Sequence, residues 1–150
     1  MADTSLNENR LSILIWQTSN LWQSKIRALL KDYDVTINEY LILETLFRLH
    51  KNQKNITQQE ICKNSGIDRS VVSLKITILE KKNFIYKNQN IDKRSFQINL
   101  TNNGKSFVEK IIINVENQEN IIFEKLGSEI YNFTNSIKLL LGKKIRIKAK

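Results

Sequence analysis

Residues 56–100 read ITQQEICKNSGIDRSVVSLKITILEKKNFIYKNQNIDKRSFQINL, and this stretch decides the fold. The spacing Thr57-x-x-Glu60 is a capping box, which marks the start of a helix. Gly66 ends that helix, because glycine tolerates the left-handed backbone of a sharp turn.

Asp68 then caps a second helix. Its apolar stripe recurs at Val72, Ile76 and Leu79. Two helices joined by a short glycine-containing turn are typical of a helix-turn-helix, whose second helix enters the major groove of DNA.

Two strands are expected after the second helix, at residues 84–86 and 96–100. The second of these, FQINL, alternates apolar and polar residues, which is the period of a half-buried strand. The residues between them, KNQNIDKRS (87–95), are polar and charged and predict the tip of a hairpin. The sequence therefore predicts a winged helix, in which a β-hairpin follows the helix-turn-helix.

The whole chain, residues 1–150, is predicted to be one domain with a mainly α fold, an α+β winged helix between long helices. The winged-helix region covers about residues 36–100 and opens at a second capping box, Thr36-x-x-Glu39. Apolar periodicity predicts long helices at about 5–31 and 102–142, the latter interrupted at Gly127, and a basic tail at 143–150. These helices carry more apolar surface than the winged helix can cover. We expect a C2 homodimer, the alternative being that they fold back on their own chain.

The charge balance favours a polyanionic partner. There are 24 Lys and Arg residues against 15 Asp and Glu, a net charge of +9, although a generally basic surface would give the same excess. The single cysteine, Cys62, allows no internal disulfide, which suits a reducing cytoplasm, and is interpreted as a small packed residue rather than a redox sensor. One His and one Cys cannot form an ordinary zinc site, and no cofactor, signal peptide or membrane span is expected.

The middle third of the chain resembles the MarR family of bacterial winged-helix regulators. The similarity lies in GIDRSVVS (66–73), in LEKKNFI (79–85), and in a wing that carries Asp92 and Arg94 and is followed by LTNNG (100–104). The resemblance implies a homodimeric transcription regulator that binds a pseudo-palindromic operator. Such proteins usually repress, and many release DNA when they bind a small aromatic or lipophilic ligand.

Helical geometry predicts which residues of the second helix face DNA. If its apolar stripe is buried, the outer face carries Arg69, Ser70, Ser73 and Thr77. Arg69 can contact a phosphate or a guanine edge, and the hydroxyl groups can contact phosphates or bases. Val71 and Leu74 depart from the residues that relatives often carry. Both are assigned to the DNA-binding set, because they can contact a thymine methyl group, but either could instead pack inside the protein.

The wing supplies the other predicted DNA contacts. Arg94 is expected to enter the minor groove, where narrow A·T-rich DNA concentrates negative potential. Asp92 is expected to pair with Arg94 and orient it, as the resemblance suggests. Lys87 and Lys93 are placed over phosphates, although each alone could simply aid solubility.

Three aromatic residues are assigned to an effector site because the resemblance places them near the family's ligand cleft: Trp16, Trp22 and Tyr40. Such residues are more often part of a core. An enzyme is disfavoured, because the four glycines are isolated and the single histidine, His50, has no neighbouring nucleophile in the sequence. Two other functions remain open: a non-sequence-specific architectural or nucleoid DNA-binding protein, and a winged helix that binds another protein.

Overall fold

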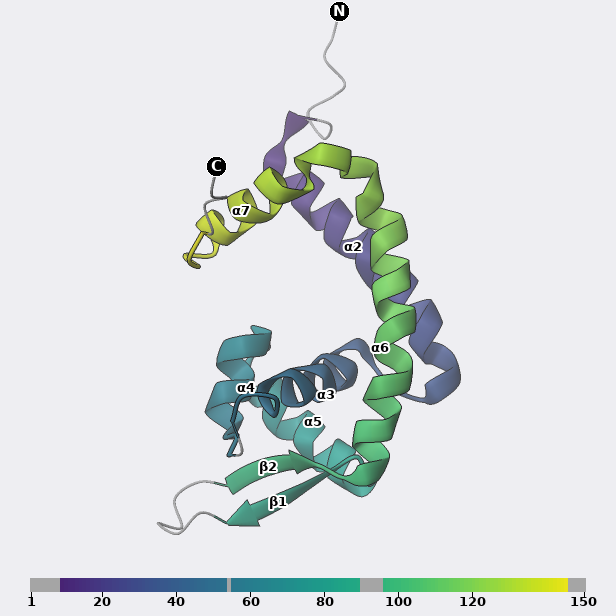
Figure 1. Cartoon of the computed structure of the whole chain (residues 1–150), viewed down its shortest axis with the longest axis vertical. Coiled ribbons are helices and arrows are strands. Elements are labelled where there is room, and N and C mark those ends of the chain that lie inside the picture. The colour runs from purple at the N-terminus through teal and green to yellow at the C-terminus, as the bar shows by residue number, and fades with distance from the viewer. Residues whose placement is uncertain (1–8, 54, 90–95, 146–150) are drawn as a thin grey trace, which may run out of the picture. The chain divides into compact units, whose positions relative to one another are not determined.

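The computed structural model describes residues 9–53, 55–89 and 96–145, which fall into two compact units, the first ending at Val115 and the second beginning at Glu116. The predicted mainly helical fold with a winged helix is confirmed (Figure 1). In chain order the elements are α2 (Leu11–Leu30), η1 (Lys31–Tyr33), α3 (Ile37–Leu49), α4 (Gln58–Ser65), α5 (Arg69–Lys81), β1 (Ile85–Gln89), β2 (Phe96–Leu100), α6 (Asn102–Phe123), η2 (Glu124–Glu129) and α7 (Ile130–Leu140).

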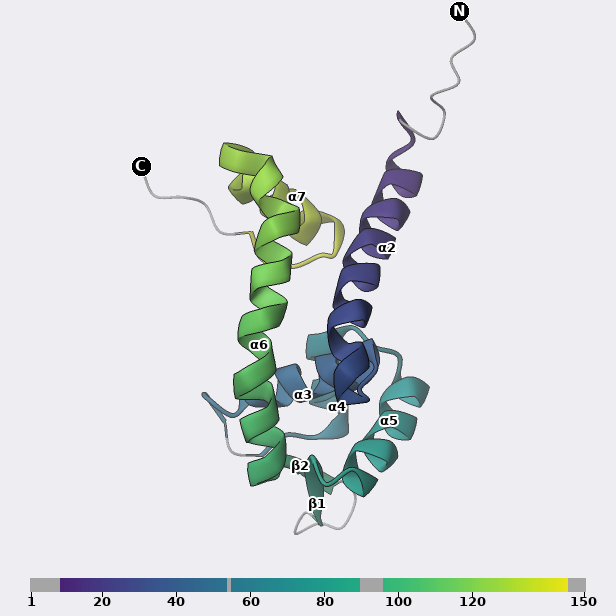
Figure 2. The ribbon, with the colours of Figure 1, turned by 90° about the vertical axis from the view of Figure 1, so that its right-hand side faces the viewer.

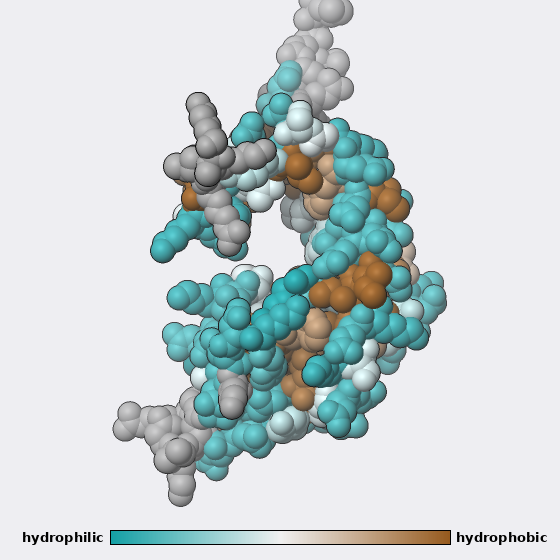
Figure 3. Space-filling model, viewed as in Figure 1, coloured by the Kyte–Doolittle hydropathy of each residue, from teal (hydrophilic) through white to brown (hydrophobic). Residues whose placement is uncertain are grey.

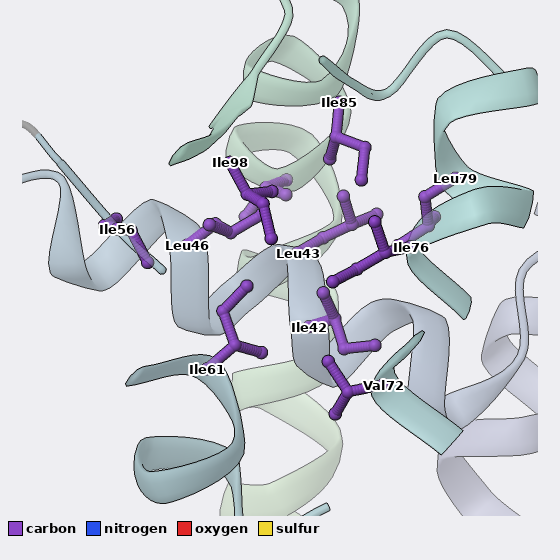
Figure 4. Packing of buried hydrophobic residues seen from close by; sticks show 11 residues of the cluster. Ile42, Leu43, Leu46, Ile56, Ile61, Val72, Ile76, Leu79, Ile85 and Ile98 are labelled. Carbon is purple, nitrogen blue, oxygen red and sulfur yellow. The ribbon is translucent and has the colours of Figure 1, made fainter. Parts of the chain in front are cut away.

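The core of the first unit forms around α3. Three residues of this helix, Ile42, Leu43 and Leu46, lie at the centre of Figure 4 and are fully buried. Side chains from α4, α5, both strands and the segment before α4 surround them, namely Ile56, Ile61, Val72, Ile76, Leu79, Ile85 and Ile98. The predicted stripe of α5 therefore packs inward, as its spacing indicated. Cys62 packs against the same cluster and is half-buried.

A second cluster joins three helices of the first unit. Ile26 and Leu30 of α2 pack with Tyr40 of α3 and with Ile111 and Val115 of α6. This cluster fixes α2 and the first part of α6 on the winged helix, beside which both segments lie in the ribbon view (Figure 2).

The predicted starts of α3 and α4 and the predicted end of α4 are present. The backbone N–H groups of Glu39 and Glu60 each donate to the threonine three residues earlier, Thr36 and Thr57, at 3.3 Å. Gly66 ends α4 with φ +75°, a left-handed conformation that an L-residue adopts with strain. Threonine side chains therefore satisfy terminal backbone groups at the starts of α3 and α4, as the two capping boxes predicted.

The two strands form an antiparallel hairpin, with Ile85 opposite Leu100 and Gln89 opposite Phe96. Strand β1 extends to Gln89, three residues beyond the predicted end at residue 86. The predicted strand ended too early because residues 87–89 are polar. They are nevertheless part of β1, since they pair with residues 96–98 of β2. A third segment joins the hairpin: Ile98 N–H donates to the Ile56 carbonyl at 2.8 Å. The wing is therefore tied to the start of the helix-turn-helix.

The second unit contains the end of α6, η2 and α7. Gly127 has φ +54° and ψ −126° and interrupts the helical backbone where the sequence predicted a break. No residue of α7 is buried within the described chain, although Phe133, Leu139 and Leu140 are large and apolar. None of the described helices is long and apolar enough to cross a membrane.

Candidate nucleic-acid interface

Helix α5 presents one face to the core and the opposite face to solvent. Arg69, Ser70, Ser73 and Thr77 are all exposed, whereas the inward stripe is fully buried. Figures 1 and 2 place α5 and the hairpin at the same end of the first unit. The predicted outer face is therefore accessible, and it is long enough to lie in a major groove.

The first turn of α5 is fixed by Asp68. Its carboxylate accepts hydrogen bonds from the Ser70 hydroxyl at 2.5 Å and from the Ser70 backbone N–H at 3.2 Å. These hydrogen bonds lower the pKa of Asp68, so the cap stays ionised at neutral pH. Ser70 is exposed, but its hydroxyl proton is already donated to Asp68, so toward DNA this hydroxyl is best suited to accept a hydrogen bond.

The two positions left open by the sequence behave differently. Leu74 is 61% exposed, on the solvent side of α5. Val71 is half-buried. Leu74 can therefore contact a thymine methyl group without any rearrangement of the protein. Val71 is accessible to DNA over only part of its side chain, because the rest packs against the protein.

A recess of about 630 Å³ brings Arg69 together with Lys87 of the wing. These two cations come from separate elements, and the sequence did not indicate that they share a site. Gln58 and Gln59, at the start of α4, also line the recess, as do Thr57, Cys62, Phe96 and Ile98. The glutamines were missed in the sequence, where their one distinguishing signal is that they directly follow the capping Thr57. Two cations and two amides can together hold a phosphate or a base edge.

Lys87 has two neighbours that orient it. Its Nζ lies 3.9 Å from Oε1 of Glu80 and 5.7 Å from the centre of the Phe96 ring. The pair with Glu80 is partly exposed and therefore contributes little to stability. The ring of Phe96 is 53% exposed and keeps the ammonium group of Lys87 at the surface beside the recess through a cation–π contact.

The predicted tip of the wing lies outside the described residues. This applies to Asp92, Lys93 and Arg94, whose assignment to the minor groove and to phosphates stays a prediction.

The three predicted effector residues lie in different surroundings. Trp22 lines a groove of about 840 Å³ between α2 and the start of α3, to which α5 contributes Lys75. Trp16 is 67% exposed on α2 and does not line this groove. Tyr40 is fully buried and its hydroxyl donates to Glu44 at 2.8 Å, so it belongs to the core beside the groove.

The described residues contain no group of three or more His, Cys, Asp or Glu side chains that could hold a metal ion. The groups exposed at this surface are cations, hydroxyl groups, amides and one apolar side chain on a helix, which are the groups that contact phosphates and base edges in a major groove. These features define a winged-helix DNA-binding protein.

A model of the family described as transcriptional regulator SarA/Rot matches residues 24–111, which is more than half of the chain. The chain belongs to the SarA/Rot family of transcriptional regulators, and its members are regulators rather than enzymes.

Individual proteins agree with this assignment. The chain is 28% identical to the HTH-type transcriptional regulator YdcH of Bacillus subtilis, over 85% of this chain and 87% of YdcH. It is 25% identical to Staphylococcus aureus MepR in a complex with DNA, with a TM-score of 0.78, over 88% of this chain and 97% of MepR. A MarR-family regulator from Rhodococcus has the same fold, with a TM-score of 0.76 at 13% identity over 89% and 93% of the two chains. The resemblance to MarR regulators is thereby confirmed.

Proposed function

We propose that this DNA-binding regulator acts in the cytoplasm as a homodimeric repressor of a pseudo-palindromic operator. The observation that carries the proposal is the exposed face of α5, which adjoins the cation of the wing across one recess. Arg69, Ser73 and Leu74 supply three different chemistries for reading base edges: a bidentate donor, a hydroxyl group and an apolar contact.

Affinity comes mainly from phosphate contacts. The net charge of +9 per chain supports release of counterions when lysine and arginine side chains neutralise phosphates. If a dimer makes about 6–10 such contacts, its affinity falls by orders of magnitude between low and moderate salt. Sequence preference then depends on the base contacts of α5, because phosphate contacts carry no sequence information.

The exposed apolar residues support a homodimer. In the first unit, α2 exposes Leu11, Ile15 and Trp16, and in Figure 3 hydrophobic side chains also reach the surface over α6. In the second unit, α7 exposes Phe133, Leu139 and Leu140, and the exposed Leu141 follows as its C-cap. Apolar patches of this kind mark interaction sites, and pairing of like surfaces around a two-fold axis is the commonest way to cover them.

Selection from a pool of random DNA duplexes tests this function. We expect the recovered duplexes to share a pseudo-palindrome with half-sites centred about 10 base pairs apart, and to bind two chains each. A pool from which no sequence is enriched would contradict the proposal and would favour an architectural DNA-binding protein.

A second part of the proposal concerns the groove beside Trp22. Its wall combines the apolar residues Val35, Ile37 and Leu41 with Arg27, Lys31 and Lys75. An aromatic or lipophilic acid fits this combination, because its ring meets apolar surface while its carboxylate meets cations. Adding benzoate to the protein–operator complex should quench Trp22 fluorescence and release DNA in the same concentration range. Release that persists in Trp22→Phe but is lost in Arg27→Gln would support the groove, and unchanged release in both Arg27→Gln and Lys31→Gln would contradict it.

A further inference from the structure

One carboxylate in the interior joins the start of α3 to α5. Glu39 is the single charged residue that is buried in the part of the chain the structure describes, with 2% of its surface exposed. Its Oε2 accepts a hydrogen bond from Lys75 Nζ at 3.1 Å, and its Oε1 accepts one from Lys82 Nζ at 2.7 Å. The Thr36 hydroxyl donates to Oε2 at 2.5 Å. Both oxygens are satisfied, which is the condition for keeping a buried charge.

This carboxylate is ionised at neutral pH. Burial raises the pKa of Glu39, but the hydrogen bonds from the two ammonium groups and the threonine hydroxyl outweigh burial and hold the pKa below its ordinary value. The interaction is therefore a charged clamp, stronger and more directional than a neutral hydrogen bond.

The two lysines hold α5 at separate points. Lys75 lies in the middle of the helix and Lys82 is its C-cap. Seven residues correspond to about two turns and roughly 10 Å of helix, so both side chains leave the same face and converge on Glu39. Lys82 also donates to the Asp34 carbonyl at 2.6 Å, in the turn that precedes α3. Two anchors on one face oppose both rotation of the helix about its axis and sliding along it.

Apolar packing and the clamp constrain α5 in different ways. The buried stripe of α5 is held by the hydrophobic effect, which is non-directional. Charge-assisted hydrogen bonds have a defined length and angle. A rotation of α5 about its axis would turn Ser73 and Leu74 away from the base edges they are placed to meet.

We propose that Glu39 is a positioning residue for DNA recognition, which sets through Lys75 and Lys82 the angle at which α5 enters the major groove. Because Glu39 is buried, it acts through the two lysines and does not touch DNA. This inference rests on the proposed function, since it presumes that α5 reads sequence.

The variant Glu39→Gln tests the proposal, because glutamine keeps the shape and removes the charge. The dissociation constants for the selected operator and for a random duplex are measured at the same salt concentration. We expect operator affinity to fall about ten- to a hundredfold, the cost of one mismatched base pair, while affinity for the random duplex stays within about twofold. If Glu39 had a merely structural role, its loss would lower the fraction of active protein. Binding to both duplexes would then weaken alike, and the ratio of the two dissociation constants would not change.

A matched control lies just over one turn further along α3. Glu44 pairs at 3.2 Å with Arg48 and accepts a hydrogen bond from the Tyr40 hydroxyl at 2.8 Å, and both of these partners belong to α3 rather than α5. The measured ratio is the dissociation constant for the random duplex divided by that for the operator. Glu44→Gln should leave this ratio at the wild-type value. An equal fall in that ratio for Glu44→Gln and Glu39→Gln would overturn the specific role of Glu39.

The variant Lys75→Met covers the case in which Glu39→Gln does not fold. The Lys75 side chain is 18% exposed and its removal leaves Glu39 with Lys82, so the variant retains half of the clamp. We expect a smaller fall in the ratio, about three- to tenfold. If Lys75→Met is folded and its ratio equals that of wild type, the proposal is wrong. If the wild-type protein itself binds operator and random duplex equally, the proposed function is wrong as well. Failure of the Glu39 proposal and failure of the proposed function are therefore distinguishable.

Discussion

Gly104, in the first turn of α6, lies directly against the backbone of Phe84, which precedes the wing. A Cβ atom at Gly104 would overlap the Phe84 carbonyl oxygen and would lie 2.9 Å from its carbonyl carbon. The same carbonyl oxygen accepts a hydrogen bond from Thr101 N–H at 3.0 Å. This contact joins the wing to α6, and no side chain can occupy the space between them.

The variant Gly104→Ala should therefore destabilise the fold. Backbone atoms cannot move aside as a flexible side chain would, so we expect a decrease of at least about 1–3 kcal/mol in the free energy of unfolding. Urea denaturation measures this decrease. Gly66→Ala is the comparison, because a Cβ there meets nothing within 4 Å and any cost comes from its positive φ alone. Equal stability of Gly104→Ala and wild type would show that α6 can shift away from Phe84 at no cost.

Arg69 should contribute sequence preference as well as affinity. The variant Arg69→Ala is expected to weaken operator binding by about 1–3 kcal/mol and to relax the preferred base at one position of each half-site. Repeating the selection of bound sequences with this variant measures both effects. Lys25→Ala, which removes an exposed cation of α2, serves as the control and should retain the wild-type sequence preference. An unchanged preference in Arg69→Ala would place this residue on phosphate alone.

Lys87 should behave differently from Arg69, although both line the same recess. A phosphate contact carries no sequence information. Lys87→Ala is therefore expected to lower the affinity for the operator and for a random duplex to the same degree. The slope of log affinity against log salt should also decrease by about one for each phosphate that the variant no longer neutralises. Titrations at several salt concentrations measure that slope, and weakening confined to the operator would assign Lys87 to a base.

His50 predicts a pH dependence of stability. Burial lowers its pKa from the ordinary value of 6.5, Lys105 lowers it further, and a backbone hydrogen bond with Gln53 acts in the opposite direction. Its Nε2 is buried without a hydrogen-bond partner among the described residues. Because the unfolded chain binds this proton more readily than the folded protein, the stability contributed by neutral His50 is complete above about pH 6.5 and is lost as the pH falls toward the folded pKa.

Comparison with His50→Gln isolates this effect. Between about pH 7 and pH 5 the free energy of unfolding of the wild type should decrease more steeply than that of the variant. Thermal or urea denaturation across this range provides the measurement. Parallel pH profiles for the two proteins would mean that His50 titrates equally in the folded and unfolded states.

Association through α7 is tested by placing a charge on its apolar face. The variant Phe133→Asp should shift the protein from dimer to monomer in light scattering coupled to size exclusion, because an unpaired carboxylate would be buried in the interface. Asn132→Asp adds the same charge one residue away, about 100° around the helix, and should remain dimeric. Two dimeric variants would exclude this face of α7 from the interface.

The features that follow from local chemistry could be predicted from the sequence. Thr57, Gly66 and Asp68 mark the helix ends because each satisfies a backbone group within a few residues. The inward stripe of α5 follows from helical periodicity. The exposed position of Leu74 did not follow, because a residue at the edge of an apolar stripe is placed by its neighbours rather than by its spacing.

Glu39 shows most clearly what the sequence conceals. The pattern Thr36-x-x-Glu39 indicates a capping box, and the threonine half of that box is present. The carboxylate instead binds Lys75 and Lys82, which lie 36 and 43 residues away in the chain. The spacing from Thr36 already accounts for a glutamate at this position as part of a capping box. Nothing in the sequence therefore pointed to its distant partners. The recess shared by Arg69 and Lys87 escaped prediction for the same reason.

Methylation interference on the selected operator tests the central claim most directly, because methylation of guanine N7 blocks contacts in the major groove. We expect two groups of interfering guanines, centred about 10 base pairs apart and related by the symmetry of the site. Strong binding without any interfering guanine, or with a single group only, would contradict the claim that two copies of α5 read the DNA.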